Sequence, residues 1–399
     1  MSRLAELIEE LCPDGVEYRA LGDVGVFVRG GGLQKADFVE TGMPCVHYGQ
    51  IHTRFGISVS EAVTFVSEAQ FARLKHADYG DLLIATTSED DEAVGKATAW
   101  LGDGEVAISG DMFYYRHNLE PKYVSYFFAS SSFQDQKRPY LTGAKVRRIA
   151  DKGLSRIQIP VPPLEVQREI ARILDQFTTL EAELEAELEA RRAQYEHYRN
   201  YLLSYESLAA RGPVEMVKLG EMLDMRAGTS ISSKYIFEQA DSDCIYPCYG
   251  ANGLRGYVQS MNHEHDASVI GRQGALCGNV TYACGPFFAT EHAVVVTPRV
   301  ELSQRWLYHS LIVANLSQYA TKSAQPGLSV RRVAEVEIPV PSVSEQYRIA
   351  DLLDHFDALV NDITSGLPAE IAARRAQYEH YRDRLLSFPE KRVSDRESS

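Results

Sequence analysis

The stretch IQIPVPPLEVQREIARILDQF occupies residues 157–177, and the similar stretch VEIPVPSVSEQYRIADLLDHF occupies residues 336–356. Each is followed by the same decapeptide, ARRAQYEHYR, which begins first at Ala190 and again at Ala373. Internal sequence repeats indicate the repeating unit of a fold, so they are considered before the pattern of helices and strands. The chain is therefore one unit written twice, with well-matched ends and poorly matched middles.

The matched segments have the pattern of long helices. From 164 to 205 the sequence contains no Gly or Pro, and apolar or aromatic residues recur at spacings of three, four or seven. Such a helix would be ~60 Å long, so a second long helix is needed to cover its apolar stripe. The second copy supplies one, with a kink or short break predicted at TSGLP (364–368). Duplicated halves favour an antiparallel pair, and two independent surface helices are the alternative.

The unmatched middles, at about 20–156 and 213–335, combine short β-rich runs with one helical piece each. Each middle therefore predicts a compact domain, which we call a head. The expected fold class is α+β, with two heads of mixed α/β character joined by two long antiparallel coiled-coil helices in a pseudo-twofold internal repeat. The expected bounds are 1–156 for the first head, 157–210 for the central helix, 211–335 for the second head, 336–390 for the C-terminal helix and 391–399 for a tail.

The composition is that of an ordinary globular protein, with 45% hydrophobic and 24% charged residues. No apolar run is long enough for a membrane span, and the acidic opening MSRLAELIEELC argues against a signal peptide. We therefore expect a cytoplasmic protein without a membrane partner. The formal net charge of −14 does not exclude nucleic-acid binding, because five glutamates are concentrated in LEAELEAELEA (180–190).

Signatures of catalysis and of metal binding are missing from the sequence. It has no phosphate-binding loop, zinc-binding helix, nucleophile elbow or dinucleotide-binding glycine motif. The pairs Cys244-x3-Cys248 and Cys277-x6-Cys284 do not have the usual zinc spacing, so we expect buried free thiols. The acidic run SEDDE (88–92) lacks the spacing of a cation site and predicts a solvated loop. We expect no catalytic residue, no metal site and no cofactor on this chain.

Two basic stretches occur at matching places, each between the helical piece of a head and the IPVP segment: KRPYLTGAKVRR (137–148) and ATKSAQPGLSVRR (320–332). Their cations can neutralise phosphates, and Gly143 and Gly327 would let the backbone approach closely. In GRQG (271–274), Arg and Gln suit the edges of guanine and adenine. Solvated basic loops and a plain hairpin turn are the alternatives. The predicted DNA-contacting residues are Lys137, Arg138, Lys145, Arg147, Arg148, Arg272, Gln273, Lys322, Arg331 and Arg332.

The duplicated IPVP segments and the twin RRAQYEHYR helices resemble the specificity (S) subunit of type I restriction–modification systems over essentially the whole chain. The repeat in LEAELEAELEA is similar to the central spacer of the class C branch, and the opening LCPDGVEYRALG also resembles that family. The resemblance implies that the heads are two target recognition domains, each of which reads one half of a bipartite site in double-stranded DNA.

The resemblance also implies partners. The helices would space the heads and dock two methyltransferase (M) subunits, which bind S-adenosylmethionine and methylate adenine. Restriction and translocase (R) subunits would add cleavage driven by ATP and Mg²⁺. This chain would then be non-catalytic. The alternatives are a duplicated coiled-coil scaffold that does not bind DNA and an enzyme with an unrecognised site, for which His47, His52, His292 and Cys248 are loose candidates.

The repeated decapeptide predicts two identical docking surfaces for two identical partners. Its tyrosines (Tyr195, Tyr198, Tyr378 and Tyr381) are expected to pack, and its polar face is expected to point outward. Packing alone is the alternative explanation of the repeat. The predicted partner-binding residues are Arg191, Arg192, Gln194, His197, Arg374, Arg375, Gln377 and His380.

Overall fold

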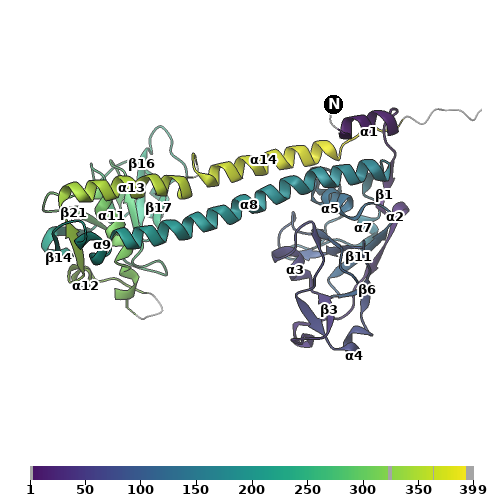
Figure 1. Ribbon diagram of the computed structural model, residues 1–399, viewed down its shortest axis with the longest axis horizontal. Coiled ribbons are helices and arrows are strands. Elements are labelled where there is room, and N and C mark those ends of the chain that lie inside the picture. Colours follow the sequence, from purple (N-terminus) through teal and green to yellow (C-terminus); the bar gives the residue numbers. More distant parts are fainter. Residues whose placement is uncertain (1–2, 322–325, 363, 392–399) are drawn as a thin grey trace, which may run out of the picture. The chain divides into compact units, whose positions relative to one another are not determined.

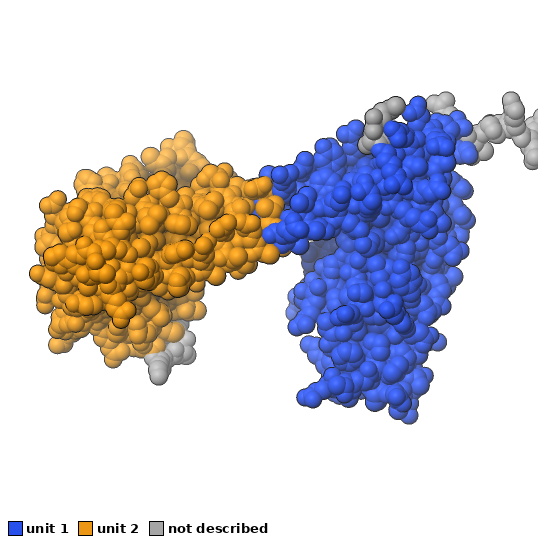
Figure 2. Space-filling view, in the orientation of Figure 1, with its two compact units in different colours: residues 1–183, 371–399 blue, residues 184–370 orange. Residues whose placement is uncertain are grey.

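The computed structural model describes residues 3–321, 326–362 and 364–391. The chain folds into two compact units: unit 1 comprises residues 1–183 with 371–399, and unit 2 comprises residues 184–370 (Figure 2). Each unit contains one β-rich head and a part of both helical segments. This division cuts across the helices, so it does not test the domain bounds expected from the sequence, which remain a prediction.

The head of unit 1 is built from a five-stranded sheet, a four-stranded sheet, two two-stranded sheets and several short helices (Figure 1). Its larger sheet has the strand order β2-β11-β7-β9-β4, and its second sheet has the order β5-β3-β10-β6. The strands are β1 (Tyr18–Ala20), β2 (Gly25–Arg29), β3 (Met43–Val46), β4 (Ser58–Val59), β5 (Thr64–Val66), β6 (Lys75–Ala77), β7 (Leu82–Ala85), β8 (Thr87–Ser88), β9 (Ala97–Trp100), β10 (Val106–Ile108), β11 (Met112–His117), β12 (Arg147–Arg148) and β13 (Gln158–Pro160). The α-helices are α1 (Arg3–Leu11), α2 (Leu21–Val24), α3 (Tyr48–Thr53), α4 (Glu68–Phe71), α5 (Pro121–Ala129), α6 (Ser131–Lys137) and α7 (Asp151–Leu154).

Strand β7 lies in the middle of the larger sheet, and this position explains its continuous apolar run. Leu82 and Ile84 belong to a cluster that includes α5 and the start of α8 (Leu164–Leu202), whereas Leu83 and Ala85 belong to a second cluster. Successive strand residues point to opposite faces, so a strand covered on both faces must be apolar throughout. The polar residues that follow Ala85 are thereby held at the end of a rigid strand.

The head of unit 2 repeats this frame with different side chains. Its sheet order β15-β21-β18-β19 corresponds to β2-β11-β7-β9, and its parallel pair β16 with β20 corresponds to β3 with β10. Its strands are β14 (Val214–Lys218), β15 (Leu223–Ala227), β16 (Tyr246–Gly250), β17 (Gly253–Val258), β18 (Ala267–Gly271), β19 (Val280–Ala283), β20 (Phe288–Ala289), β21 (Ala293–Pro298) and β22 (Glu337–Pro341). Its helices include α9 (Tyr205–Ala209), α10 (Leu219–Met222), α11 (Gln304–Val313) and α12 (Val330–Ala334).

The long helices follow the pattern expected from the sequence. Helix α8 is continuous, whereas the second segment is divided into α13 (Val343–Asn361) and α14 (Leu367–Leu385) (Figure 1). The break coincides with the Gly and Pro of TSGLP, and the amide of Gly366 there donates to the carbonyl of Asp362 at 3.0 Å. The predicted interruption is confirmed.

In unit 1, α8 and α14 run antiparallel. The ring of Phe177 stacks on Tyr381 with 5.5 Å between centroids, and Glu181 pairs with Arg375 at 2.5 Å. Residue numbers therefore rise along α8 as they fall along α14.

The equivalent aromatic contact occurs in unit 2, where Tyr198 stacks on Phe356 at 6.1 Å. Phe177 and Phe356 are equivalent in the sequence repeat, as are Tyr198 and Tyr381. Each copy thus contributes one half of the same contact to each unit. The expected α+β architecture with an internal repeat and long antiparallel helices is confirmed.

The cysteines are all free thiols, and five of the six are buried, as expected; the exception is the exposed Cys284. In the described part of the chain, no three His, Cys, Asp or Glu side chains are grouped so that they could hold a metal ion. Over the same residues, no helix is long and apolar enough to cross a bilayer.

Candidate nucleic-acid interface

The first basic stretch forms a hairpin that docks onto the end of β7. Arg147 and Arg148 in β12 pair with β8, and the amide of Ile149 donates to the carbonyl of Thr86 at 3.1 Å. The turn of this hairpin contains Gly143 at φ +91°, where a Cβ would lie 2.2 Å from the carbonyl oxygen of Val146. Glycine is therefore required by the turn itself.

Three of the predicted cations on this hairpin differ in their surroundings. Lys145 and Arg148 are exposed, whereas Arg147 is half-buried. The guanidinium of Arg147 pairs with Asp91 at 2.5 Å and donates to the carbonyl of Gly143 at 2.6 Å. Arg147 thus links the acidic run SEDDE to the basic hairpin, so that this run is only partly a solvated loop.

Lys137 requires a correction, because its side chain is only 1% exposed. Its ammonium group donates to the carbonyls of Glu92 at 2.8 Å and Val94 at 2.6 Å. Burial lowers the pKa of Lys137 to about 8, although the nearby carboxylates act in the opposite direction. This lysine anchors the loop after β8 from inside the head, and it has no surface to offer to a phosphate.

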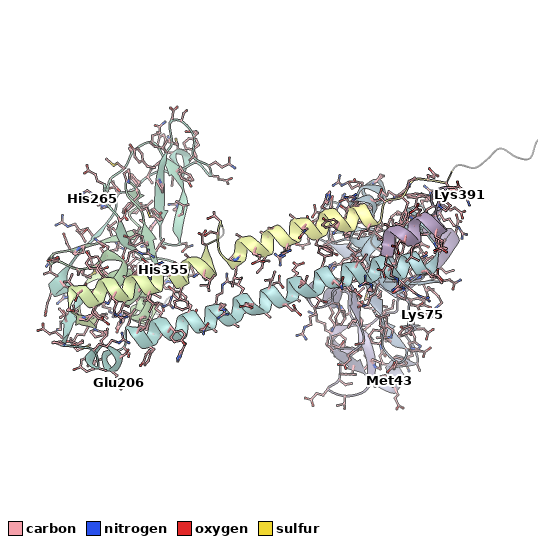
Figure 3. The ribbon with its side chains drawn as sticks, turned by 45° about the horizontal axis from the view of Figure 1, so that its top comes forward. Met43, Lys75, Glu206, His265, His355 and Lys391 are labelled. Atoms are coloured by element: carbon pink, nitrogen blue, oxygen red, sulfur yellow. The ribbon has the colours of Figure 1, made fainter. Side chains whose placement is uncertain are left out.

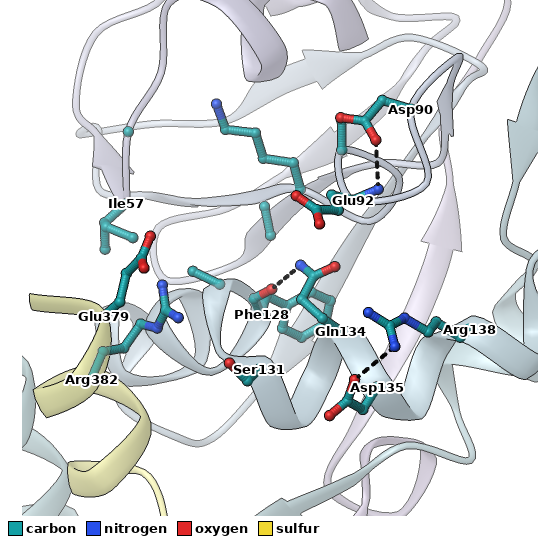
Figure 4. A pocket seen from close by; sticks show the side chains of 15 residues that line it. Ile57, Asp90, Glu92, Phe128, Ser131, Gln134, Asp135, Arg138, Glu379 and Arg382 are labelled. Carbon is teal, nitrogen blue, oxygen red and sulfur yellow. Dashed lines mark hydrogen bonds and ion pairs between the residues drawn. The ribbon is translucent and has the colours of Figure 1, made fainter. Parts of the chain in front are cut away.

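Arg138 lies at a cavity of about 600 Å³ within unit 1 (Figure 4). It pairs with Asp135 at 3.2 Å and keeps 70% of its side chain exposed. The cavity is lined by charges of both signs: Asp90, Glu92, Asp135 and Glu379 are opposed by Lys96, Arg138 and Arg382. This balance of charge does not favour an anionic ligand, so Arg138 is a weaker candidate for phosphate contact than Lys145 or Arg148.

In unit 2 the structure brings two predicted elements together. The carbonyl of Arg272 accepts from the amide of Leu328 at 2.9 Å, and Gln273 forms an antiparallel bridge with Gly327. GRQG is part of the connection between β18 and β19, as its hairpin interpretation expected, and this connection is paired with the second basic stretch. Arg272 is half-buried and Gln273 is exposed.

The remaining cations of the second stretch do not repeat the arrangement of the first. Arg331 and Arg332 are exposed on α12, beside the ion pair of Lys218 with Glu335 at 2.8 Å. In the first head the arginines that match them in the sequence, Arg147 and Arg148, lie in the hairpin strand β12 itself. The prediction for Lys322 lies outside the described residues.

A further pair of polar residues, His292 and Glu291, lies at this place and was not connected with GRQG by the sequence analysis. His292 and Glu291 lie in the turn between β20 and β21, and the carbonyl of His292 accepts from the amide of Arg272 at 3.0 Å. The Nε2 atom of His292 lies 3.5 Å from Oε1 of Glu291. The sequence offered His292 only as a loose catalytic candidate, and no motif links it to Arg272, because the link is a backbone hydrogen bond.

The other loose catalytic candidates have structural partners. In unit 1, His47 accepts from the amide of Gly49 at 3.3 Å and caps α3, while Nε2 of His52 lies 3.1 Å from the carbonyl oxygen of Thr87. Burial lowers the pKa of both rings. In unit 2, burial raises the pKa of the Cys248 thiol, which disfavours the reactive thiolate.

The decapeptide forms the same local contacts in its two copies. The guanidinium of Arg199 lies 5.1 Å from the ring centre of Tyr195, and that of Arg382 lies 5.5 Å from Tyr378. Tyr195 is buried and Tyr378 is half-buried, and Tyr198 remains 41% exposed beside its stacking partner. The tyrosines therefore pack to different extents.

The polar residues of the decapeptide mostly face outward. Arg191 pairs with Glu187 and Arg192 with Glu189, each at 3.0 Å along α8. Arg374 donates to Gln377 at 3.3 Å. His197 and His380 are exposed, Gln377 is exposed and Gln194 is half-buried. Partner binding by these residues stays a prediction.

Each head is held on its helix by a buried glutamine. Gln167 accepts from the amide of Glu120 at 2.9 Å and donates to the carbonyl of Pro162 at 2.7 Å. Gln346 makes the same two bonds in unit 2, to Ser303 and Pro341, each at 3.0 Å. The attachment of head to helix is thus built twice from the same residue type.

The family model for the type I restriction modification DNA specificity domain matches residues 13–190 and, a second time, residues 212–373. The chain belongs to this family. Its two matched regions correspond to the two copies of the repeat, each of which contains a head and the beginning of a long helix.

Curated relatives carry the same family description. The EcoprrI specificity subunit of Escherichia coli is 44% identical over 249 residues, which cover 60% of this chain and 62% of that subunit. The chain thus matches less than two thirds of the length of this relative. The EcoR124I/EcoR124II specificity subunit of Escherichia coli is 33% identical over 299 residues, or 67% of this chain and 71% of that subunit.

A solved structure shares the fold. The S subunit of a type I restriction–modification system from M. genitalium superposes with a TM-score of 0.56 at 16% identity, covering 93% of this chain and 96% of that chain. At this identity the likeness concerns the fold alone.

Proposed function

We propose that this chain is the DNA sequence-specificity subunit of a type I restriction–modification complex. Each head reads one half of a bipartite site in double-stranded DNA, and the long helices set the distance between the halves. The observation that carries the proposal is the double family match, combined with a frame that is built twice and bears different side chains. A protein that reads two different half-sites needs this combination.

The proposed DNA surface combines phosphate contacts with base contacts. Lys145 and Arg148 in the first head and Arg331 and Arg332 in the second are exposed cations suited to phosphates. Arg272 and Gln273 are suited to base edges. Lys137 is left out of this surface because it is buried.

In this proposal the chain is not an enzyme, and methylation and cleavage belong to its partners in the cytoplasm. Two M subunits supply S-adenosylmethionine and adenine methylation, and R subunits supply ATP- and Mg²⁺-dependent cleavage. The two copies of the decapeptide offer matched surfaces for the two M subunits, as twofold assembly requires. The predicted contacts centre on Arg191, His197, Arg374 and His380.

Long-read mapping of adenine methylation, with and without this gene, tests the proposal. We expect a split motif of two short half-sites around a fixed spacer that disappears on deletion. The scaffold alternative, which the family match disfavours, predicts no salt-sensitive DNA affinity even with M subunits present. Unchanged methylation, together with no such affinity in the assembled complex, would refute the proposed function.

A further inference from the structure

We propose that His292, oriented by Glu291, contacts a base pair in the half-site that the second head reads. This inference rests on the proposed function and extends it to a residue outside the basic stretches. It concerns the junction, which we define in unit 2 as segments 271–274, 290–293 and 326–328 and in unit 1 as segments 85–88, 109–112 and 147–149.

The backbone fixes Arg272 at the centre of the junction of unit 2. Its amide donates to the carbonyl of His292 at 3.0 Å, and its carbonyl accepts from the amide of Leu328 at 2.9 Å. The amide of Gly274 also donates to the carbonyl of Pro326 at 3.0 Å. Because these bonds use main-chain atoms, the side chains of Arg272 and His292 are not needed to hold the segments together. The two residues continue the register of Gly271 with Ala293, in which opposed side chains lie on the same face.

The side chain of His292 is 41% exposed, and that of Glu291 is 39% exposed. Oε1 of Glu291 accepts from the hydroxyl of Ser230 at 3.4 Å and lies 3.5 Å from Nε2 of His292. A carboxylate beside one ring nitrogen orients an imidazole and leaves the other nitrogen for a second partner. Oε2 of Glu291 is inaccessible to solvent and has no hydrogen-bond partner among the described atoms. The exposed parts of this pair are therefore the imidazole of His292 and Oε1 of Glu291, whereas Oε2 is enclosed by the head.

The junction of unit 1 has the same backbone with different side chains. The amide of Thr86 donates to the carbonyl of Asp111 at 3.0 Å, and the carbonyl of Thr86 accepts from the amide of Ile149 at 3.1 Å. Thr86 and Asp111 therefore stand where Arg272 and His292 stand in unit 2.

The chemistry presented at the two junctions is complementary to different bases. A guanidinium beside an imidazole suits the acceptors of a purine edge, whereas a carboxylate suits the amino group of cytosine. The hydroxyl of Thr86 is already bonded to the carbonyl of Asp111 at 2.8 Å, so Asp111 is the more available group of the first head. The equivalent backbone positions therefore predict that His292 in the second head and Asp111 in the first head contribute to the base preference of the respective half-sites.

The test uses the complete complex of this chain with its M subunits. Binding is measured to the methylated motif of the wild-type complex and to duplexes with each base pair replaced in turn. The variants are His292→Ala and the nearly isosteric Glu291→Gln. His265→Ala is the matched control, because His265 (labelled in Figure 3) is exposed and precedes β18, whereas Arg272 follows the other end of that strand.

We expect His292→Ala to lower affinity for the cognate duplex roughly tenfold and to abolish discrimination at one base pair of one half-site. Glu291→Gln should weaken discrimination at the same base pair, and His265→Ala should change nothing. Discrimination in the other half-site should be preserved in these three variants. It should fall in a fourth variant, Asp111→Asn, which changes the junction of the first head.

Two results would overturn the inference. One is unchanged discrimination at every base pair in both His292→Ala and Glu291→Gln. The other is an equal loss on all duplexes with a lowered melting temperature of the complex, which a purely structural role predicts. Failure of the proposed function is distinguishable, because the wild-type complex would then show no bipartite motif at all.

Discussion

Replacing Asp354 by Asn should loosen the head of unit 2 from α13. The carboxylate accepts from Nε of Arg305 at 2.9 Å and lies 2.8 Å from Nε2 of His309, whose side chain is fully buried. Breaking a buried ion pair costs about 3–5 kcal/mol, and breaking an exposed pair costs about 0–1 kcal/mol. Because a third of the Asp354 side chain is exposed, we expect a loss of about 2–3 kcal/mol.

The equivalent residue of unit 1 provides a matched comparison. Asp175 pairs with Lys122 at 2.7 Å and accepts from the hydroxyl of Tyr126 at 2.9 Å, and both members of the ion pair are about as exposed as Asp354. One lysine contact and a neutral hydroxyl are weaker than an arginine fork and a buried imidazole. Asp175→Asn should therefore cost about 1 kcal/mol.

Thermal unfolding of the complete chain measures both losses. At 2–4 °C per kcal/mol for a unit of this size, Asp354→Asn should lower the melting temperature by about 4–12 °C and Asp175→Asn by about 2–4 °C. Hydrogen exchange should show the loss of protection in α11 for the first variant and in α5 for the second. Equal shifts for the two variants, or a shift below 1 °C for Asp354→Asn, would refute the reasoning.

The pH dependence supplies an independent check of the same contact. Burial alone would raise the pKa of Asp354, but the hydrogen bonds and charges of His309 and Arg305 outweigh it and lower the pKa to about 2. A carboxyl with a depressed pKa stabilises the fold above its ordinary value of about 3.9, and this stabilisation is lost as the pH falls towards 2. Asp354→Asn should therefore flatten the decline in stability between about pH 4 and pH 2 relative to the wild type.

Four further changes have defined outcomes. Arg148→Ala should reduce the slope of log affinity against log salt by about 1, whereas Lys137→Met should leave the slope unchanged and lower the melting temperature, as DNA titrations and thermal scans would show. Gly143→Ala should strain the hairpin turn by about 1–3 kcal/mol and weaken DNA binding by the complex, which a binding titration with Gly104→Ala as control would detect. Deletion of one LEAE unit from 180–190 should shorten α8 by ~6 Å and shift the preferred spacer by a small whole number of base pairs, and an unchanged spacer in the methylation map would contradict this.

The repeat and its helices could be predicted because their determinants are local. The absence of Gly and Pro from 164 to 205, and their presence in TSGLP, decide where a helix continues and where it stops. Buried strands such as β7 and β18 could also be predicted, because each is a short apolar run between turn residues. These features depend on neighbouring residues of one segment and need no knowledge of its partners.

The register of the heads could not be obtained in this way. By residue type, HYGQ (47–50) is similar to CYGA (248–251), which would make Tyr48 equivalent to Tyr249, but the structure places Val46 where Tyr249 lies. The carbonyl of Val46 accepts from the amide of Ser109 at 3.1 Å, and that of Tyr249 accepts from Thr290 at 2.9 Å. Hydrogen bonding between main-chain atoms does not depend on residue type. Similar residues in the two heads therefore need not occupy equivalent positions.

The same reason explains why Lys137 was wrongly expected at the surface and why His292 was not connected with Arg272. Lys137 was expected at the surface because lysine is seldom buried, but its partners are carbonyl groups, which every residue possesses. His292 was not connected with Arg272 because a backbone bond brings them together across β18 and β21. Both cases required the fold before the side chains could be given a role.

The two units also show how one frame can carry different specificities. On the helix side the residue types are constant, since glutamine recurs at 167 and 346, aspartate at 175 and 354, and phenylalanine at 177 and 356. On the head side the partners of the aspartate differ: they are Lys and Tyr in unit 1 and Arg and His in unit 2. Both pairs nevertheless donate hydrogen bonds to the equivalent carboxylate of their unit. A head that offers donors at these positions can therefore be held by either helix, whatever its junction carries. The residues that fasten the head are separate from those proposed to read DNA, so the junction can change without loss of the attachment.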